Sequence, residues 1–194
     1  MRKLLAILTL LTITFTSVFA FTDQEQFRAA NYLASKSFIK DYHTNVKEYR
    51  IGDSITRKES MKILANVAAL KVETTCLSSF KDVSDDWGCK YIEAALKAGF
   101  IKQSDKFRPD DNITKAEVMK LLFKARNLEK KYNTGIWQED YMNSAFNYGL
   151  TDETAKDYNS DAVRGWLFVV ISRSFTDYLN DKNYILYSDE VKVK

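Results

Sequence analysis

A cation directly follows a predicted helix-capping threonine at two places in this chain. The two stretches are Ile-Thr-Arg-Lys-Glu at 55–59 and Ile-Thr-Lys-Ala-Glu at 113–117. Their Thr-x-x-Glu spacing is typical of a capping box, in which each side chain accepts a hydrogen bond from a backbone N–H at the helix start. Arg57 and Lys115 would then be first helical residues, where a cation opposes the helix dipole by about 0.3–1 kcal/mol.

This repeated unfavourable choice indicates that each cation meets an anion. Backbone N–H groups at a helix start, joined by a guanidinium or ammonium, form a compact site for a carboxylate or phosphate. We therefore predict that Arg57 and Lys115 bind an anionic ligand beside a shared cleft, and that Arg164 supplies a third such cation. A solvated side chain, or an internal ion pair with Asp53 or Asp111, would explain the pattern without a ligand.

Several other residues are candidates for contact with a carbohydrate. Trp87 and Trp137 precede predicted helices, and their ring faces could stack on the apolar faces of sugars, although packing in a core is the commoner use of tryptophan. Asp82 could accept hydrogen bonds from a sugar, but stabilising a turn is its more usual role. Gly99 and Gly149 would let a ligand approach the backbone, while termination of a helix is sufficient reason for both glycines.

The two motifs belong to a longer repeat that covers most of the chain. Tyr49–Glu59 and Phe107–Glu117 align without a gap, and apolar residues at helical spacing follow both. A weaker third copy has Ala-Val-Arg-Gly-Trp at 162–166, so its capping box is lost and Asp161 becomes the expected cap. The chain is thus predicted to be mainly α, with three helix–loop–helix units. They span 21–71, 72–129 and, in degenerate form, 130–182, followed by a C-terminal tail at 183–194 or, alternatively, a short extra strand near 184–187.

The composition favours an exported helical protein. One proline and six glycines are too few for the tight turns of a β-sandwich or barrel. Arg2 and Lys3, followed by an uncharged apolar run ending in Val-Phe-Ala, predict a signal peptide over 1–20, with an uncleaved anchor as the alternative. Cleavage removes two cations and lowers the formal net charge from +3 to +1. We therefore expect neither nucleic-acid binding nor a membrane span in the mature chain.

The cysteine and histidine content limits the possible chemistry. Cys76 and Cys89 are the only cysteines, and in an exported chain they predict a disulfide, with two buried thiols as the alternative. His43 is the only histidine, which argues against zinc sites and histidine-dependent catalysis. The patterns GxSxG and GxxxxGK are absent as well. We predict no metal, no cofactor and no enzymatic activity.

The second unit resembles an S-layer homology repeat. In order along the chain, it has Phe80-x-Asp82-Val83-x-x-x-Trp87, a helix ending Ala98-Gly99-Phe100-Ile101, Phe107-x-Pro109, and Ile113-Thr114-Lys115-Ala116-Glu117. Lys115 replaces the arginine of the family's ITRAE hallmark. The resemblance implies a pseudo-trimeric bundle of three repeats, with grooves between repeats that bind cell-wall polysaccharide, commonly one bearing pyruvate ketals.

The resemblance also implies a function and a location. It favours a non-catalytic anchoring module, secreted to the cell surface or the cell wall, that binds an acidic polysaccharide. The ligand-binding residues it implies are Arg57, Lys115, Arg164, Trp87, Trp137, Asp82, Gly99 and Gly149. The alternative is a scaffold that packs another envelope or S-layer protein and binds no polysaccharide.

Overall fold

The described part of the chain is mainly helical, as predicted. The computed structural model describes residues 21–42, 44–72, 75–152 and 157–180. Within these ranges there are helices and isolated β-bridges but no strand, and no helix is long and apolar enough to cross a membrane. The predicted signal peptide over 1–20, the short strand near 184–187 and the tail at 183–194 lie outside the described residues.

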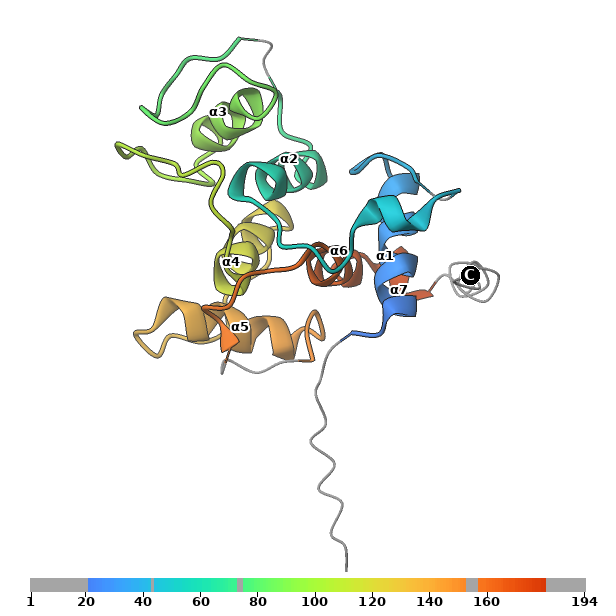
Figure 1. Ribbon diagram of the computed structural model, residues 1–194. Coiled ribbons are helices and arrows are strands. Elements are labelled where there is room, and N and C mark those ends of the chain that lie inside the picture. The colour runs from blue at the N-terminus through green and yellow to red at the C-terminus, as the bar shows by residue number, and fades with distance from the viewer. Residues whose placement is uncertain (1–20, 43, 73–74, 153–156, 181–194) are drawn as a thin grey trace, which may run out of the picture.

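The helices form pairs that join different predicted units. The elements are α1 (Asp23–Ser35), the 3-10 helix η1 (Val46–Tyr49), α2 (Arg57–Val67), α3 (Cys89–Lys97), α4 (Lys115–Ala125), α5 (Trp137–Asn147), α6 (Arg164–Arg173) and α7 (Thr176–Asn180). Helix α3 packs on α2, α5 packs on α4, and α1 packs on α6 (Figure 1). The last long helix therefore closes onto the first, which makes the arrangement circular.

A ring of backbone hydrogen bonds lies at the centre of this circle. The Ile55 N–H donates to the Ala162 carbonyl at 3.1 Å, Ala162 N–H to Ile113 at 2.8 Å, and Ile113 N–H to Ile55 at 3.1 Å. All three side chains are at most 1% exposed. The ring thus joins the residues just ahead of α2, α4 and α6, which are far apart in sequence. The division of the chain into three repeats stays a prediction.

The starts of α2 and α4 are as predicted, whereas the start of α6 is not. Thr56 and Thr114 cap their helices with complete capping boxes, so these helices begin at Arg57 and Lys115. Helix α6 begins at Arg164, and its N-cap residue makes no side-chain capping bond. The prediction that Asp161 caps this helix is wrong, because its carboxylate accepts a hydrogen bond from the Asn112 side chain at 2.7 Å instead.

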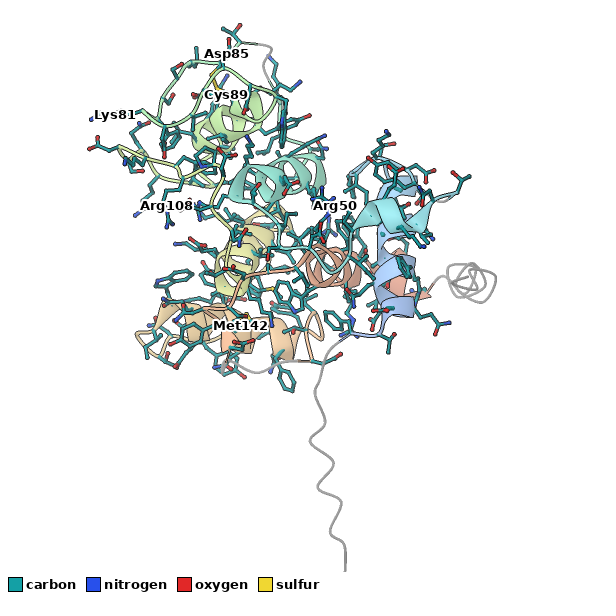
Figure 2. All side chains as sticks on the ribbon, in the orientation of Figure 1. Arg50, Lys81, Asp85, Cys89, Arg108 and Met142 are labelled. Atoms are coloured by element: carbon teal, nitrogen blue, oxygen red, sulfur yellow. A yellow bond between two sulfur atoms is a disulfide. The ribbon has the colours of Figure 1, made fainter. Side chains whose placement is uncertain are left out.

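The predicted disulfide between Cys76 and Cys89 is confirmed. It ties the loop after α2 to the first residue of α3, and Figure 2 shows Cys89 on that helix. Glu93 is the third member of the one group of potential metal ligands found among the described residues. Both sulfurs are used in the disulfide, and the Glu93 carboxylate accepts hydrogen bonds from the Ser79 N–H and hydroxyl.

Replacing Thr114 with alanine should lower the free energy of unfolding by about 1 kcal/mol, because the Glu117 N–H loses the acceptor it has at 3.3 Å. Thr114→Ser keeps that oxygen and should remain within about 0.5 kcal/mol of the parent. Urea denaturation followed by circular dichroism measures both. Equal losses in the two variants would contradict the capping role.

Replacing both Cys76 and Cys89 with serine should lower the free energy of unfolding by about 3 kcal/mol, because the sulfurs close a loop with a sequence separation of 13. The same denaturation experiment checks this value. Adding a reducing agent to the parent should produce the same loss and should leave the double variant unchanged. A parent that is insensitive to reduction would refute a stabilising bridge.

Candidate functional site

Each of the three predicted cations lines a pocket of its own. The prediction that Arg57 and Lys115 share a cleft is therefore wrong. The physical reason is the central ring, which holds the starts of α2, α4 and α6 around one point, so that their first side chains point into different interfaces.

The Arg57 pocket is the most basic of the three. The residues that line it come from α2, the segment between α2 and α3, the segment between α3 and α4, α4 itself and α5. They are Arg57, Phe80, Phe100, Ile101, Lys102, Ser104, Lys106, Phe107, Glu117, Lys120, Leu121, Lys124 and Trp137.

The Arg164 pocket is built like the Arg57 pocket: the arginine that begins one helix lies beside the capping glutamate of another. Its lining comes from α6, η1, α2 and the segments that follow α1 and precede α3. The residues are Phe38, Ile39, Lys40, Tyr42, Tyr49, Glu59, Lys62, Ile63, Trp87 and Arg164.

The Lys115 pocket lies between the start of α1, the start of α4 and the segment that leads into α6. Its lining comes from the start of α4, the segment before α6, the start of α6 and the first residues of the described chain. The residues are Phe21, Gln26, Lys115, Asp157, Ser160, Asp161, Val163 and Trp166.

The anion that Arg57 and Arg164 meet first is internal. Arg57 donates to the Phe107 carbonyl at 2.9 Å and to Glu117 Oε1 at 2.7 Å. Arg164 donates in the same way to the Tyr49 carbonyl at 2.9 Å and to Glu59 at 3.3 Å. Each glutamate also accepts the N–H of its own capping threonine, so one carboxylate caps a helix and holds an arginine from another unit.

The structure therefore favours internal ion pairs for these cations, but with partners other than those predicted. Asp53 pairs with Arg50, and Asp111 pairs with Arg108. Lys115 instead lies 3.2 Å from Asp157. These pairs explain the cations at the helix starts without an external ligand.

The backbone N–H groups of the helix starts are engaged as well. The N–H of Arg57 donates to the Asp111 carbonyl at 2.9 Å, that of Lys115 to Ser160 at 3.0 Å, and that of Arg164 to Asp53 at 2.9 Å. The predicted anion site made of helix-start N–H groups is therefore not formed. An anion in these pockets has to be held by side chains.

Exposed tryptophans stand beside lysines in two of the pockets. Trp87 is 46% exposed and Trp137 is 37% exposed. Lys62 Nζ lies 5.5 Å from a ring centroid of Trp87, and Lys120 Nζ lies 4.6 Å from that of Trp137. Each exposed tryptophan thus has a lysine over its ring, and contact of Trp87 and Trp137 with a sugar stays a prediction. Trp137 is the first residue of α5 rather than a residue before it.

Electrostatics distinguish the Arg57 pocket from the others. Its described lining carries five cations and one carboxylate. Burial, together with the nearby charges of Lys120 and Lys102, lowers the pKa of Lys124. The Arg164 pocket has three cations and one carboxylate, and burial lowers the pKa of Arg164 there. In the Lys115 pocket one cation faces two carboxylates.

Asp82, Gly99 and Gly149 have structural roles and do not line the three pockets. Asp82 accepts hydrogen bonds from the N–H groups of Phe107 and Arg108, each at 2.8 Å, which stabilises the turn at 108–111. Gly99 and Gly149 end α3 and α5 with φ of 72° and 70°. A Cβ at either glycine would meet no protein atom within 4 Å, and the left-handed backbone is sufficient reason for glycine at both positions.

Sequence reasoning missed the lysines of the Arg57 pocket. Lys120 and Lys124 are four residues apart on α4, a spacing that places both on one helix face. Lys102 and Lys106 lie in the segment between α3 and α4. The four-residue spacing of Lys120 and Lys124 was visible in the sequence. The approach of the segment between α3 and α4 to helix α4, in contrast, depends on the tertiary fold.

Comparison with known proteins finds a family match in the middle of the chain, from ahead of α3 into α4. The sequence model of the S-layer homology domain matches residues 79–119. This segment is an S-layer homology domain. The match includes Phe80, Asp82 and Trp87 and the Ile113–Glu117 motif, so the predicted resemblance of the second unit is confirmed.

Several S-layer proteins are similar to the chain over a longer stretch. S-layer protein EA1 of Bacillus anthracis is 29% identical over 177 residues, which is 84% of this chain and 20% of that protein. An S-layer protein of Bacillus licheniformis is 31% identical over 133 residues, covering 62% of this chain and 15% of its own length. The chain thus spans a fifth or less of the S-layer proteins to which it is similar.

One similar protein is named as an enzyme. An amylopullulanase of Thermoanaerobacterium thermosulfurigenes is 34% identical over 87 residues, but these make up only 5% of that protein. So short a match carries no argument for catalysis in this chain. Together, the S-layer homology domain and the S-layer relatives support a structural module and confirm the predicted cell-surface location.

A double-mutant cycle on Arg57→Met and Glu117→Gln should give a coupling free energy of roughly 1 kcal/mol, because this ion pair is short and largely shielded from solvent. The glutamine side chain would keep an oxygen for the capping box. Denaturation of the parent, the two single variants and the double variant measures the coupling. The exposed pair of Lys81 and Asp105 is the control and should couple by less than about 0.5 kcal/mol. Additive losses at Arg57 and Glu117 would show that the pair contributes nothing.

Proposed function

We propose that this protein is a non-catalytic module that attaches to the cell envelope by binding an acidic polysaccharide in the Arg57 pocket. The observation that carries this proposal is the excess of positive charge there, five cations against one carboxylate. Cations held together without enough counter-charge repel one another, and an anionic ligand relieves that repulsion. Burial, and after it the nearby charges of Lys120 and Lys102, lowers the pKa of Lys124, so the neighbouring lysines disfavour its charged form.

The side chains of the pocket suit an acid that is attached to a sugar. Trp137 offers a half-exposed ring face at one edge, with the ammonium of Lys120 4.6 Å from the ring centroid. A sugar stacked on this ring would bring its acidic substituent next to Lys120 and the neighbouring lysines. A pyruvate ketal, which bridges two hydroxyl oxygens of a sugar and carries a free carboxylate, is the substituent that the family resemblance implies.

Arg57 contributes differently from the lysines. Its guanidinium already donates to Glu117 and to the Phe107 carbonyl, so it offsets the Glu117 charge. The lysines therefore provide the net positive charge. Lys124 also donates to the Gly99 and Phe100 carbonyls, which orients it at the end of α3.

The Arg164 pocket supports the same function more weakly. It combines three cations and one carboxylate with Trp87, the more exposed of the two surface tryptophans. A polymer with repeated acidic substituents could occupy both pockets of one molecule, which would raise the overall avidity.

The double variant Lys102→Gln, Lys120→Gln should be retained roughly three- to tenfold less well on purified cell walls, because it loses two partly exposed cations of the Arg57 pocket. The matched control Lys47→Gln, Lys97→Gln removes the same charge from exposed lysines outside the three pockets and should bind like the parent.

Co-sedimentation with walls measures this retention, and it should fall as the salt concentration rises. Walls whose acidic substituents have been removed chemically should retain the parent no better than the double variant. Equal retention of both double variants would overturn the proposal. Retention that requires a wall protein and survives removal of the acidic groups would favour the protein–protein scaffold instead.

A further inference from the structure

The residue that follows each helix-start cation differs among the three motifs. Lys58 follows Arg57, whereas Ala116 and Gly165 stand at the same place in the other two. The backbone is alike at all three positions, since each N–H donates to a carbonyl of an adjoining segment, at 2.9, 3.1 and 2.8 Å in chain order. Lys58 therefore brings a long charged side chain to a place where the other motifs have a small residue.

The ammonium of Lys58 lies between two carboxylates. Its Nζ is 2.9 Å from Asp86 and 2.8 Å from Asp110, and only 17% of its side chain is exposed. The hydrogen bonds to Asp110 and then to Asp86 raise the pKa of Lys58, so the side chain is charged at neutral pH. A shielded cation is unfavourable without its partners, so it holds both aspartates in place. One aspartate precedes α3 and the other precedes α4, and α2 packs against both helices (Figure 1).

The segment ahead of α3 also carries Trp87, which lines the Arg164 pocket. Trp87 follows Asp86 directly, and the Gly88 N–H donates to Asp86 at 2.7 Å. Lys58 Nζ lies 5.5 Å from a ring centroid of Trp87, within the range of a cation–π contact. A Cβ on Gly88 would lie 3.1 Å from the Lys58 Cδ, so this turn packs directly on the stem of the lysine.

We infer that Lys58 is a positioning residue for Trp87, whose exposed ring it holds beside the Arg164 pocket by pairing with the neighbouring Asp86. Lys58 is not among the described residues that line this pocket, so its effect on a bound ligand has to pass through Trp87. A ring that is already held loses less conformational freedom when it contacts a ligand. The inference rests on the proposed function in taking the Arg164 pocket to receive a ligand.

The motion of the Trp87 indole tests this inference without any ligand. Nitrogen-15 labelling of the full chain gives one indole N–H resonance for each of the three tryptophans, and Trp87→Phe assigns the relevant one. We expect its order parameter, from nitrogen-15 relaxation, to be about 0.85 in the parent and below about 0.6 in Lys58→Met. Lys58→Arg should restore the high value, because a guanidinium also pairs with carboxylates.

Retention on purified cell walls shows whether the effect of Lys58 passes through Trp87. Lys58→Met should lower retention about two- to threefold, the change expected for the ordering of one side chain. In a chain that already carries Trp87→Phe, Lys58→Met should lower it no further. The matched control Lys81→Met removes the same charge from a largely exposed pair with Asp105, and it should change neither retention nor the order parameter.

A second variant, Asp86→Asn, serves if circular dichroism shows that Lys58→Met does not fold. Asparagine keeps an oxygen for the Gly88 N–H but loses the ion pair, so the Trp87 order parameter should fall in the same way. A Trp87 order parameter that stays high in every folded variant would overturn the inference, and so would a loss of retention that persists beside Trp87→Phe. Failure of the parent to bind walls would refute the proposed function alone, since the order parameters are measured without walls.

Discussion

The ring of backbone hydrogen bonds among Ile55, Ala162 and Ile113 is the constraint on which the rest of the structure depends. It joins segments that are far apart in the sequence, more than a hundred residues in the case of Ile55 and Ala162. The side chains of its three residues are completely or almost completely buried. Because each residue both donates to one neighbour and accepts from the other, the loss of one member would leave buried polar groups unpaired at the centre. The ring also places the starts of α2, α4 and α6 around one point.

This placement explains why the helix starts cannot act as anion sites. Carbonyl groups of the adjoining segments accept the first N–H of each helix, and capping side chains accept others. The cations that follow are then directed into three separate interfaces. Two of them meet a glutamate that also caps a helix, so the capping of one unit and its contact with the next rest on the same carboxylate.

The third interface shows what happens when that carboxylate is absent. Trp166 occupies the position of the capping glutamate, so this interface has no arginine–glutamate pair. Lys115 occupies the position of the arginine and lies beside the Trp166 ring. The pocket charges differ accordingly, from strongly positive around Arg57 to slightly negative around Lys115. The three pockets around the ring thus differ in charge, because the path of the main chain does not fix which charged side chains line them.

The sequence by itself determined the local structure of this protein. The helical class, the capping boxes at Thr56 and Thr114, the disulfide and the S-layer homology motif all depend on residues that are close in the chain, and each was predicted correctly. The roles of Gly99 and Gly149 as helix ends were also visible, because only the local backbone decides them.

Tertiary structure alone decided which residues meet. The partners of Arg57 and Arg164 lie 60 and 105 residues away, and a local pattern contains no information on such contacts. For the same reason the sequence suggested one shared cleft where there are separate pockets, and it missed the lysines that converge beside Trp137. Spacing along a helix fixes the face on which a charge lies, whereas the path of the whole chain fixes what that face meets.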